Sequence, residues 1–238
     1  MKIVAIIQAR VGSTRLPGKV LLDLAGEPML ARVIDRLKGA CRLDEVIVAT
    51  TTMPKDDAIV ALCEDRGWRF FRGDEHDVLD RYYHAARACA ADVVVRITSD
   101  CPLIDPGVVD DTIAAFLEHQ PALDYAVNEG FPRGLDTEVI GAEALNRAWR
   151  EARDPALREH VTAHIYRHPA DYRLFQITHE PDLSHLRWTV DTPEDFEVAE
   201  LIFRHFQNKP FSWREALALW EQHPEWQEIN RDIQQKVV

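Results

Sequence analysis

The sequence has little positive charge, few cysteines and no long hydrophobic run. Its 28 Lys and Arg residues are outnumbered by 40 Asp and Glu residues, which gives a formal net charge of −12. A protein that coats nucleic acid needs a basic surface to displace counterions from phosphates, so this charge argues against a general nucleic-acid coat. Any polyanion that the protein binds must therefore meet a local cluster of cations.

Other absences narrow the class of protein further. Apolar runs such as residues 93–95 are far shorter than the ~20 residues that span a bilayer, and the N-terminus has no signal-peptide cleavage pattern. We therefore expect a soluble cytoplasmic protein. The four cysteines form no Cys-x-x-Cys pair, so buried reduced thiols are expected rather than a zinc knuckle or a disulfide framework. With 46% apolar residues, the 238-residue chain can bury a sizeable core.

Short β-branched runs alternate with amphipathic segments along the chain. The runs Ile3–Ile7, Val46–Ala49 and Val93–Ile97 are typical of strands buried on both faces. Between them, apolar residues recur at helical spacing around 29–37 and 58–63. This alternation predicts an α/β fold with a Rossmann-like, mostly parallel sheet. Further helices are expected over 76–91, 106–119, 141–152, 155–168, 193–207 and 212–222, and strands near 136–140, 173–178 and 187–190.

The loop after the first strand is rich in glycine and in cations. Arg10, Arg15 and Lys19 fall within ten residues, and glycines allow a backbone to approach a ligand closely. Open α/β sheets bind ligands at the carboxyl ends of their strands, so this loop is predicted to bind phosphate. It is not a Walker motif, because five residues separate Gly12 from Gly18 and no Ser or Thr follows the lysine. The absence of G-x-G-x-x-G also disfavours an NAD-dependent dehydrogenase.

Asp100 and Asp191 each follow a predicted strand. The Cys101-Pro102 pair ends the first strand, so Asp100 is expected at its C-terminal edge. After the second strand, Thr192 is suited to cap the next helix and Asp195 to close a capping box, so Asp191 is not needed as the cap. Mg²⁺ takes one or two carboxylates together with phosphate oxygens. We therefore predict that Asp100 and Asp191 bind Mg²⁺.

The string at residues 7–21, IQARVGSTRLPGKVL, closely resembles the opening of the cytidylyltransferases that activate acidic sugars, namely the 3-deoxy-manno-octulosonate and acylneuraminate enzymes. It looks closest to the spore-coat polysaccharide biosynthesis branch. The resemblance continues through 26–30, 96–105 and 188–196. It implies a fold of the nucleotide-diphospho-sugar transferase type with a small substrate and dimerisation elaboration.

The resemblance also implies how the chain is divided. Residues 1–238 would form a single nucleotidyltransferase domain with a nucleotide-binding half at 1–130, an acceptor and metal half at 131–210 and a C-terminal helical tail at 211–238. The Pro- and Gly-bearing stretch at 128–134 is the best candidate for the boundary between the halves, although it could equally be one loop in one domain.

The resemblance also implies which residues form the site, by matching positions of this sequence to the family's motifs. The nucleotide is expected to contact Ala9, Arg10, Gly12, Ser13, Arg15, Lys19, Arg81 and Asp100. Of these, Arg10, Lys19 and Asp100 are expected to be catalytic. In the resembling enzymes the aspartates that match Asp100 and Asp191 hold the metal. Val78 and Leu79 stand where the octulosonate enzymes carry small residues. Whether the protein uses CTP or another triphosphate therefore stays open.

An acceptor site is predicted over residues 131–138, which overlap the end of the boundary stretch. Arg133 suits an acidic group, while Asp136 and Glu138 suit hydroxyls or a coordinated ion. We therefore expect transfer of CMP from CTP to an acidic sugar or sugar-like acceptor. Three alternatives remain: a metal-dependent glycosyltransferase, a nucleotide-sensing module without turnover, and nucleotidyl transfer to a phosphorylated or phosphonate acceptor. The glycosyltransferase would normally need Asp-x-Asp where this chain has Ser99-Asp100-Cys101.

Histidines and aromatics dominate the later part of the chain. His160, His164 and His168 would share one helix, and without an H-E-x-x-H context we interpret them as a solvated or interface stripe. Residues 141–180 and the tail after 208 carry many aromatic and His side chains, and the resembling cytidylyltransferases commonly pair outside the nucleotide fold. We therefore expect a homodimer.

Overall fold

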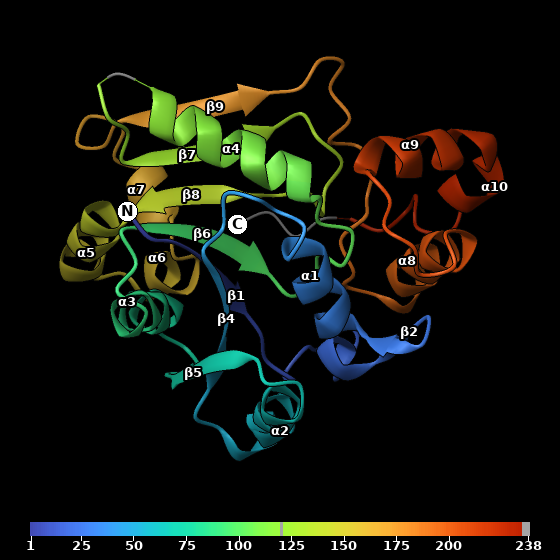
Figure 1. Ribbon diagram of the computed structural model, residues 1–238, viewed down its shortest axis with the longest axis horizontal. Coiled ribbons are helices and arrows are strands. Elements are labelled where there is room, and N and C mark those ends of the chain that lie inside the picture. Colours follow the sequence, from blue (N-terminus) through green and yellow to red (C-terminus); the bar gives the residue numbers. More distant parts are fainter. Residues whose placement is uncertain (120, 235–238) are drawn as a thin grey trace.

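The computed structural model describes residues 1–119 and 121–234. Its centre is a seven-stranded sheet with the strand order β5-β4-β1-β6-β8-β7-β9 (Figure 1). These strands are β1 (Ile3–Gln8), β4 (Glu45–Thr51), β5 (Arg69–Gly73), β6 (Val93–Thr98), β7 (Tyr125–Glu129), β8 (Glu138–Gly141) and β9 (Leu174–Thr178). A separate small sheet pairs β2 (Asp23–Leu24) with β3 (Glu27–Pro28).

The sheet is mostly parallel, as the sequence predicts. Strands β5, β4, β1 and β6 run parallel to one another, whereas β8 runs antiparallel to both β6 and β7. Strand β9 is parallel to β7. The carboxyl ends of β1 and β6 therefore lie side by side, and this edge is where open α/β sheets bind ligands.

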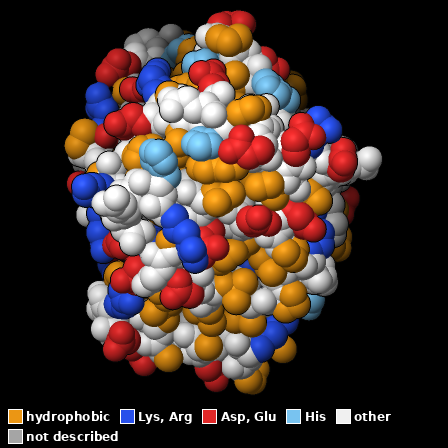
Figure 2. Space-filling view, turned by 90° about the vertical axis from the view of Figure 1, so that its right-hand side faces the viewer, with side chains coloured by type: hydrophobic (Ala, Val, Ile, Leu, Met, Phe, Trp, Pro, Cys, Tyr) orange, Lys and Arg blue, Asp and Glu red, His pale blue; other side chains and the backbone are white. Residues whose placement is uncertain are grey.

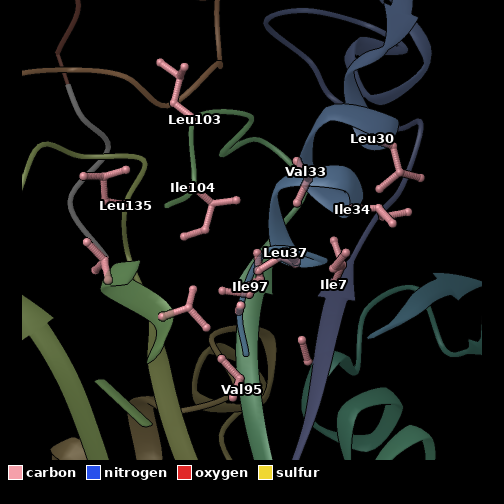
Figure 3. Packing of buried hydrophobic residues seen from close by; sticks show 14 of the residues in the cluster. Ile7, Leu30, Val33, Ile34, Leu37, Val95, Ile97, Leu103, Ile104 and Leu135 are labelled. Carbon is pink, nitrogen blue, oxygen red and sulfur yellow. The ribbon is translucent and has the colours of Figure 1, made fainter. Parts of the chain in front are cut away.

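Helices cover both faces of the sheet, which explains the unbroken apolar runs. Along β1, Ala5 and Ile7 pack into one core, while Val4 and Ile6 pack into the other. Figure 3 shows helix α1 laying its apolar side chains against β1 and β6. The first core includes residues of α1 (Met29–Leu37), α2 (Asp57–Asp65), α4 (Pro106–Glu118), α8 (Pro193–His205) and α9 (Trp213–Gln222). The second includes residues of α3 (Val78–Ala88), α5 (Ala142–Glu151) and α7 (Ala163–Tyr166).

Two predicted elements differ in the structure. The helix expected over 155–168 is broken into α6 (Pro155–Glu159) and α7, because Val161 adopts a left-handed backbone with φ 54°. The strand expected near 187–190 is an extended loop held by one isolated bridge between Arg133 and Arg187. Strands β5 and β7, neither of which the sequence analysis predicts, complete the sheet.

Several aromatic and histidine side chains in the later part of the chain are buried. Trp213 and Trp220 are each only 3% exposed, so they pack onto their own chain, whereas Tyr166 is 40% exposed. His164 is buried too, so the proposed solvated stripe is wrong at that position. Cysteines 63, 89 and 101 are buried and free as expected, but Cys41 is exposed. Within the described residues, no helix has the length and apolar character that crossing a bilayer requires.

Candidate active site

A cavity of about 420 Å³ opens at the carboxyl ends of β1 and β6. It brings together residues from the first loop, from helix α3, from the turn after β6 and from the loop before α8. Every residue predicted to contact the nucleotide or the metal lines it, namely Ala9, Arg10, Gly12, Ser13, Arg15, Lys19, Arg81, Asp100 and Asp191. Residues almost two hundred positions apart therefore share one site.

The first loop is folded back on itself and is held by a hydrogen bond to Asp56. The carbonyl of Val11 accepts the N–H groups of Ser13 and Gly18 at 2.8 and 3.1 Å. Gly18 has φ 70°, a conformation that glycine adopts without steric cost. The Val11 N–H donates to Asp56 Oδ1 at 2.7 Å, and Asp56 is fully buried in the short 3₁₀ helix η2 (Pro54–Asp56). The loop is thus held in a fixed shape before any ligand binds.

Lys19 lies between the two predicted metal ligands. Its Nζ donates to Asp191 Oδ1 at 2.9 Å, to Asp100 Oδ2 at 3.2 Å and to the carbonyl of Val190 at 2.7 Å. Burial alone would lower the pKa of Lys19, but the charges of Asp100 and Asp191 outweigh it and the pKa is raised. Lys19 is therefore a fully charged ammonium at neutral pH.

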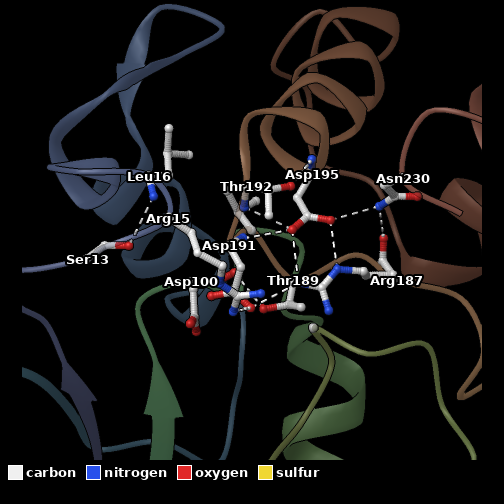
Figure 4. Close-up of polar contacts among 12 residues, drawn as sticks. Ser13, Arg15, Leu16, Asp100, Arg187, Thr189, Asp191, Thr192, Asp195 and Asn230 are labelled. Atoms are coloured by element: carbon white, nitrogen blue, oxygen red, sulfur yellow. Dashed lines mark hydrogen bonds and ion pairs between the residues drawn. The ribbon is translucent and has the colours of Figure 1, made fainter. Parts of the chain in front are cut away.

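Asp191 is held by cations on both of its oxygens. Oδ1 accepts from Lys19, and Oδ2 pairs with Arg15 at 2.8 Å and with Arg187 at 2.9 Å (Figure 4). Burial opposes the ionised form, yet the positive charges of Lys19 and Arg15 hold the pKa of Asp191 below its usual range. Asp191 is therefore an ionised carboxylate in a fixed orientation.

The carboxylate pair fits a divalent cation that also binds substrate. Within residues 1–119 and 121–234, no group of three or more His, Cys, Asp or Glu side chains is arranged to hold a metal ion. Two carboxylates at one cavity wall match the binding of Mg²⁺, which completes its shell with phosphate oxygens and water. The ammonium of Lys19 shows that a positive charge is accommodated between Asp100 and Asp191.

Two more arginines enclose the far wall of the cavity. Arg81 is 2% exposed and donates through Nη1 to the carbonyl of Asp74 at 2.8 Å. Arg96 forms an ion pair with Glu138 at 2.7 Å. Among the described residues, the Nε atoms of Arg81 and Arg96 are buried and have no hydrogen-bond partner.

The three predicted acceptor residues do not share one cavity. Glu138 reaches the main cavity only through Arg96. Arg133 and Asp136 instead line a second cavity of about 350 Å³, together with Asn128, Glu129, Gly130, Phe131, Val127, Asp182 and Ser184. The structure therefore splits the predicted acceptor site between two neighbouring regions.

Sequence reasoning missed several residues that line the main cavity. Arg96 carried a usable signal, since a charged residue near the end of a buried strand usually faces a site. Glu159 and His160 also line the cavity, because the break at Val161 ends α6 beside it. That backbone conformation has no signature in the sequence.

Comparison with known proteins shows the family of the chain. A family model described as "Cytidylyltransferase" matches residues 4–223. The chain belongs to the cytidylyltransferase family. It is therefore a nucleotidyltransferase, as the resemblance of its motifs predicts. The cytidylyltransferase from Leptospira borgpetersenii superposes with a TM-score of 0.91 at 32% identity, covering 100% of this chain and 99% of that one.

Curated relatives of this cytidylyltransferase include full-length and partial matches. The spore coat polysaccharide biosynthesis protein SpsF of Bacillus subtilis is 35% identical over 232 residues, 94% of this chain and 95% of SpsF. The 3-deoxy-manno-octulosonate cytidylyltransferase of Trichlorobacter lovleyi is 41% identical over 118 residues, 49% of this chain and 46% of that protein. SpsF, which matches over nearly its full length, belongs to the spore-coat branch that the sequence motifs indicate.

Proposed function

We propose that this cytidylyltransferase transfers CMP from CTP to an acidic sugar or sugar-like acceptor, releases pyrophosphate and uses Mg²⁺. The observation that carries the proposal is the ammonium of Lys19 bonded to Asp100 and Asp191 in a cavity that Arg10 and Arg15 also line. Guanidinium and ammonium groups suit a triphosphate, and the carboxylate pair suits a divalent cation. Since CTP and the sugar are small soluble molecules, we place the reaction in the cytoplasm.

The protein's own residues would bind and orient the triphosphate. One cation 4 Å from a phosphate oxygen is worth about 4 kcal/mol of raw Coulomb energy at an effective dielectric constant of 20. Arg10, Arg15 and Lys19 together could therefore offset much of the charge of the triphosphate. Arg81 lies across the cavity from this loop, in helix α3, and would contact the nucleoside end.

The reaction needs positioning and charge stabilisation rather than a covalent intermediate. An acceptor hydroxyl oxygen attacks the α-phosphorus in line. The bond from that phosphorus to the bridging oxygen breaks, pyrophosphate leaves with the bonding electrons, and the hydroxyl proton passes to solvent. Lys19 would neutralise the charge that develops on the leaving pyrophosphate. A divalent cation on Asp100 and Asp191, when bound, would lower the pKa of the attacking hydroxyl.

The acceptor would contact residues of both cavities. Glu138 holds Arg96 at the nucleotide cavity, so this pair suits the reacting end of the acceptor. Arg133 and Asp136 in the second cavity suit its carboxylate and its remote hydroxyls. The name of the octulosonate relative supports an acidic sugar, and the name of SpsF supports a role in polysaccharide biosynthesis.

A pyrophosphate-release assay tests the proposal. The four nucleoside triphosphates are each combined with Mg²⁺ and a panel of acidic sugars, with phosphorylated and phosphonate compounds as the competing panel. We expect release only with CTP and an acidic sugar. Release with a phosphorylated acceptor instead would replace the acceptor class. In a parallel assay with a nucleotide-sugar in place of the triphosphate, transfer of the sugar without pyrophosphate release would indicate a glycosyltransferase.

A further inference from the structure

Asn230 brings the C-terminal segment to the carboxylates of the site. It follows the short helix α10 (Pro224–Gln227) and is only 4% exposed. Its Nδ2 donates to the carbonyl of Arg187 at 2.9 Å and to Asp195 Oδ1 at 3.0 Å (Figure 4). A polar side chain near the C-terminus is thus buried in contact with Asp195, which in turn contacts Asp191, a predicted metal ligand.

Asp195 connects Asn230 to Asp191. Its side chain is fully buried. Oδ1 accepts from Arg187 Nε at 2.8 Å, and Oδ2 accepts from Arg187 Nη2 at 2.9 Å and from the backbone N–H groups of Asp191 and Thr192, each at 3.0 Å. Asp195 therefore fixes both the backbone of Asp191 and the arginine that contacts its side chain.

Arg187 completes the connection. Its Nη2 also donates to Asp191 Oδ2 at 2.9 Å, so one guanidinium bridges the buried carboxylate and the carboxylate of the cavity. A buried ion pair is held in place only when its remaining hydrogen-bonding groups are satisfied. Asn230 supplies one of the donors that Asp195 needs.

This arrangement exceeds what a helix cap requires. The cap of α8 needs only the hydroxyl of Thr192, which accepts the Asp195 N–H, and the carboxylate of Asp195, which accepts the Thr192 N–H. Arg187 and Asn230 are not required by that cap: Asn230 donates to Asp195, and Arg187 bridges Asp195 and Asp191.

We propose that Asn230, Asp195 and Arg187 are positioning residues that hold the Asp191 carboxylate in the orientation that binds the divalent cation. The C-terminal segment is then a part of the active site. This inference rests on the proposed function, because it takes Asp191 as a metal ligand. Removing a group that hydrogen-bonds to a metal ligand and orients it typically lowers metal affinity or activity 10–100-fold.

The test measures Mn²⁺ affinity on the full-length protein. Free Mn²⁺ is followed by electron paramagnetic resonance in the presence of CTP and without acceptor, for the wild type, Asn230→Ala and Arg187→Lys. Lysine keeps the charge but cannot bridge two carboxylates as a guanidinium does. We expect the Kd for Mn²⁺ to rise about 10–100-fold in both variants, with kcat largely restored at saturating Mn²⁺.

Arg231→Ala is the matched control, because Arg231 is the next residue, is exposed and pairs only with Glu228 among the described residues. It should leave the Kd for Mn²⁺ unchanged. Lower melting temperatures with unchanged Mn²⁺ affinity in Asn230→Ala and Arg187→Lys would overturn the inference and make the network purely structural. Asp191→Asn separates the two proposals: unchanged Mn²⁺ affinity in that variant removes the metal assignment itself. If Asn230→Ala does not fold, Arg187→Lys decides the outcome.

Discussion

The ammonium of Lys19 lies 2.9 Å from Asp191 Oδ1, although the two residues are 172 positions apart in the sequence. The sequence motifs place one on a phosphate-binding loop and the other on a metal site. In the protein without substrate, each group neutralises the other in a largely buried position. These two opposite charges are therefore already paired before substrate arrives, and neither of them is buried alone.

Replacing Lys19 with Ala should lower kcat about 10²–10³-fold, the usual cost of removing one group that stabilises developing charge. The KM for CTP should change far less, because Arg10 and Arg15 remain in the cavity. Steady-state kinetics of pyrophosphate release measure both constants. An unchanged kcat with a raised KM would assign Lys19 to ground-state binding alone.

Lys55→Ala is the control for this substitution. Lys55 lies beside the same loop, near Gly12, but it pairs with Glu75 and does not line the cavity. Loss of its charge should leave kcat close to the wild-type value. A similar fall in both variants would mean that the general positive charge near the loop matters, rather than the position of Lys19.

Asp100→Asn and Asp191→Asn should both lose metal-dependent turnover but differ in stability. The side chain of Asp100 is 29% exposed and forms one ion pair, whereas Asp191 is 15% exposed and pairs with three cations. Asp191→Asn should therefore melt at a lower temperature than Asp100→Asn. Near wild-type turnover of either variant in Mg²⁺ would remove that residue from the metal site.

The stability difference between wild type and Asp191→Asn should depend on pH. Positive neighbours lower the pKa of Asp191 below its unfolded value of about 3.9, so its stabilising charge is present above that pH. The contribution is lost as the pH falls through the folded pKa. Melting curves from pH 7 down to pH 2 should therefore converge for the two proteins, and a constant difference would contradict the role of charge.

The sequence predicts the parts of the site that depend on local pattern. The run Ile3–Ile7 and the glycine- and cation-rich loop after it identify a strand end and a phosphate-binding loop, because both signals lie within a few residues of each other. Thr192 and Asp195 likewise form the capping box that their spacing indicates. Here the local chemistry alone specifies the structure.

The parts that escape prediction depend on contacts between distant segments. The pairing of Arg96 with Glu138 requires the antiparallel register of β6 and β8, which no local pattern specifies. Asn230 lies in a segment with no recognisable motif, and its role follows only from its contact with Asp195, 35 residues earlier. His160 reaches the cavity because Val161 adopts a conformation that is unusual for a β-branched residue.

A homodimer stays a prediction, and within its expected interface the structure favours the tail after residue 208 together with α8. Trp213 and Trp220 are buried in their own chain, but the face over α8, α9 and α10 carries apolar side chains among acidic ones (Figure 2). Phe206, Leu217 and Trp226 are only partly buried there. Size-exclusion chromatography with light scattering should give twice the chain mass of 27.3 kDa. A mass near 27.3 kDa at micromolar concentration would exclude the dimer, and Leu217→Glu should produce that mass if this face is the interface.

Asp56 should control nucleotide binding without touching the nucleotide. Its carboxylate accepts the Val11 N–H and the hydroxyl of Thr51 in a fully buried position. Asp56→Ala leaves these donors unpaired, which should cost about 1–3 kcal/mol of stability. Because Val11 begins the phosphate-binding loop, the KM for CTP should also rise. Asp56→Asn keeps an acceptor oxygen and should be milder, and Asp57→Ala, whose side chain is 63% exposed, is the neighbouring control. Loss of stability in Asp56→Ala with an unchanged KM would mean that the loop keeps its shape without this anchor.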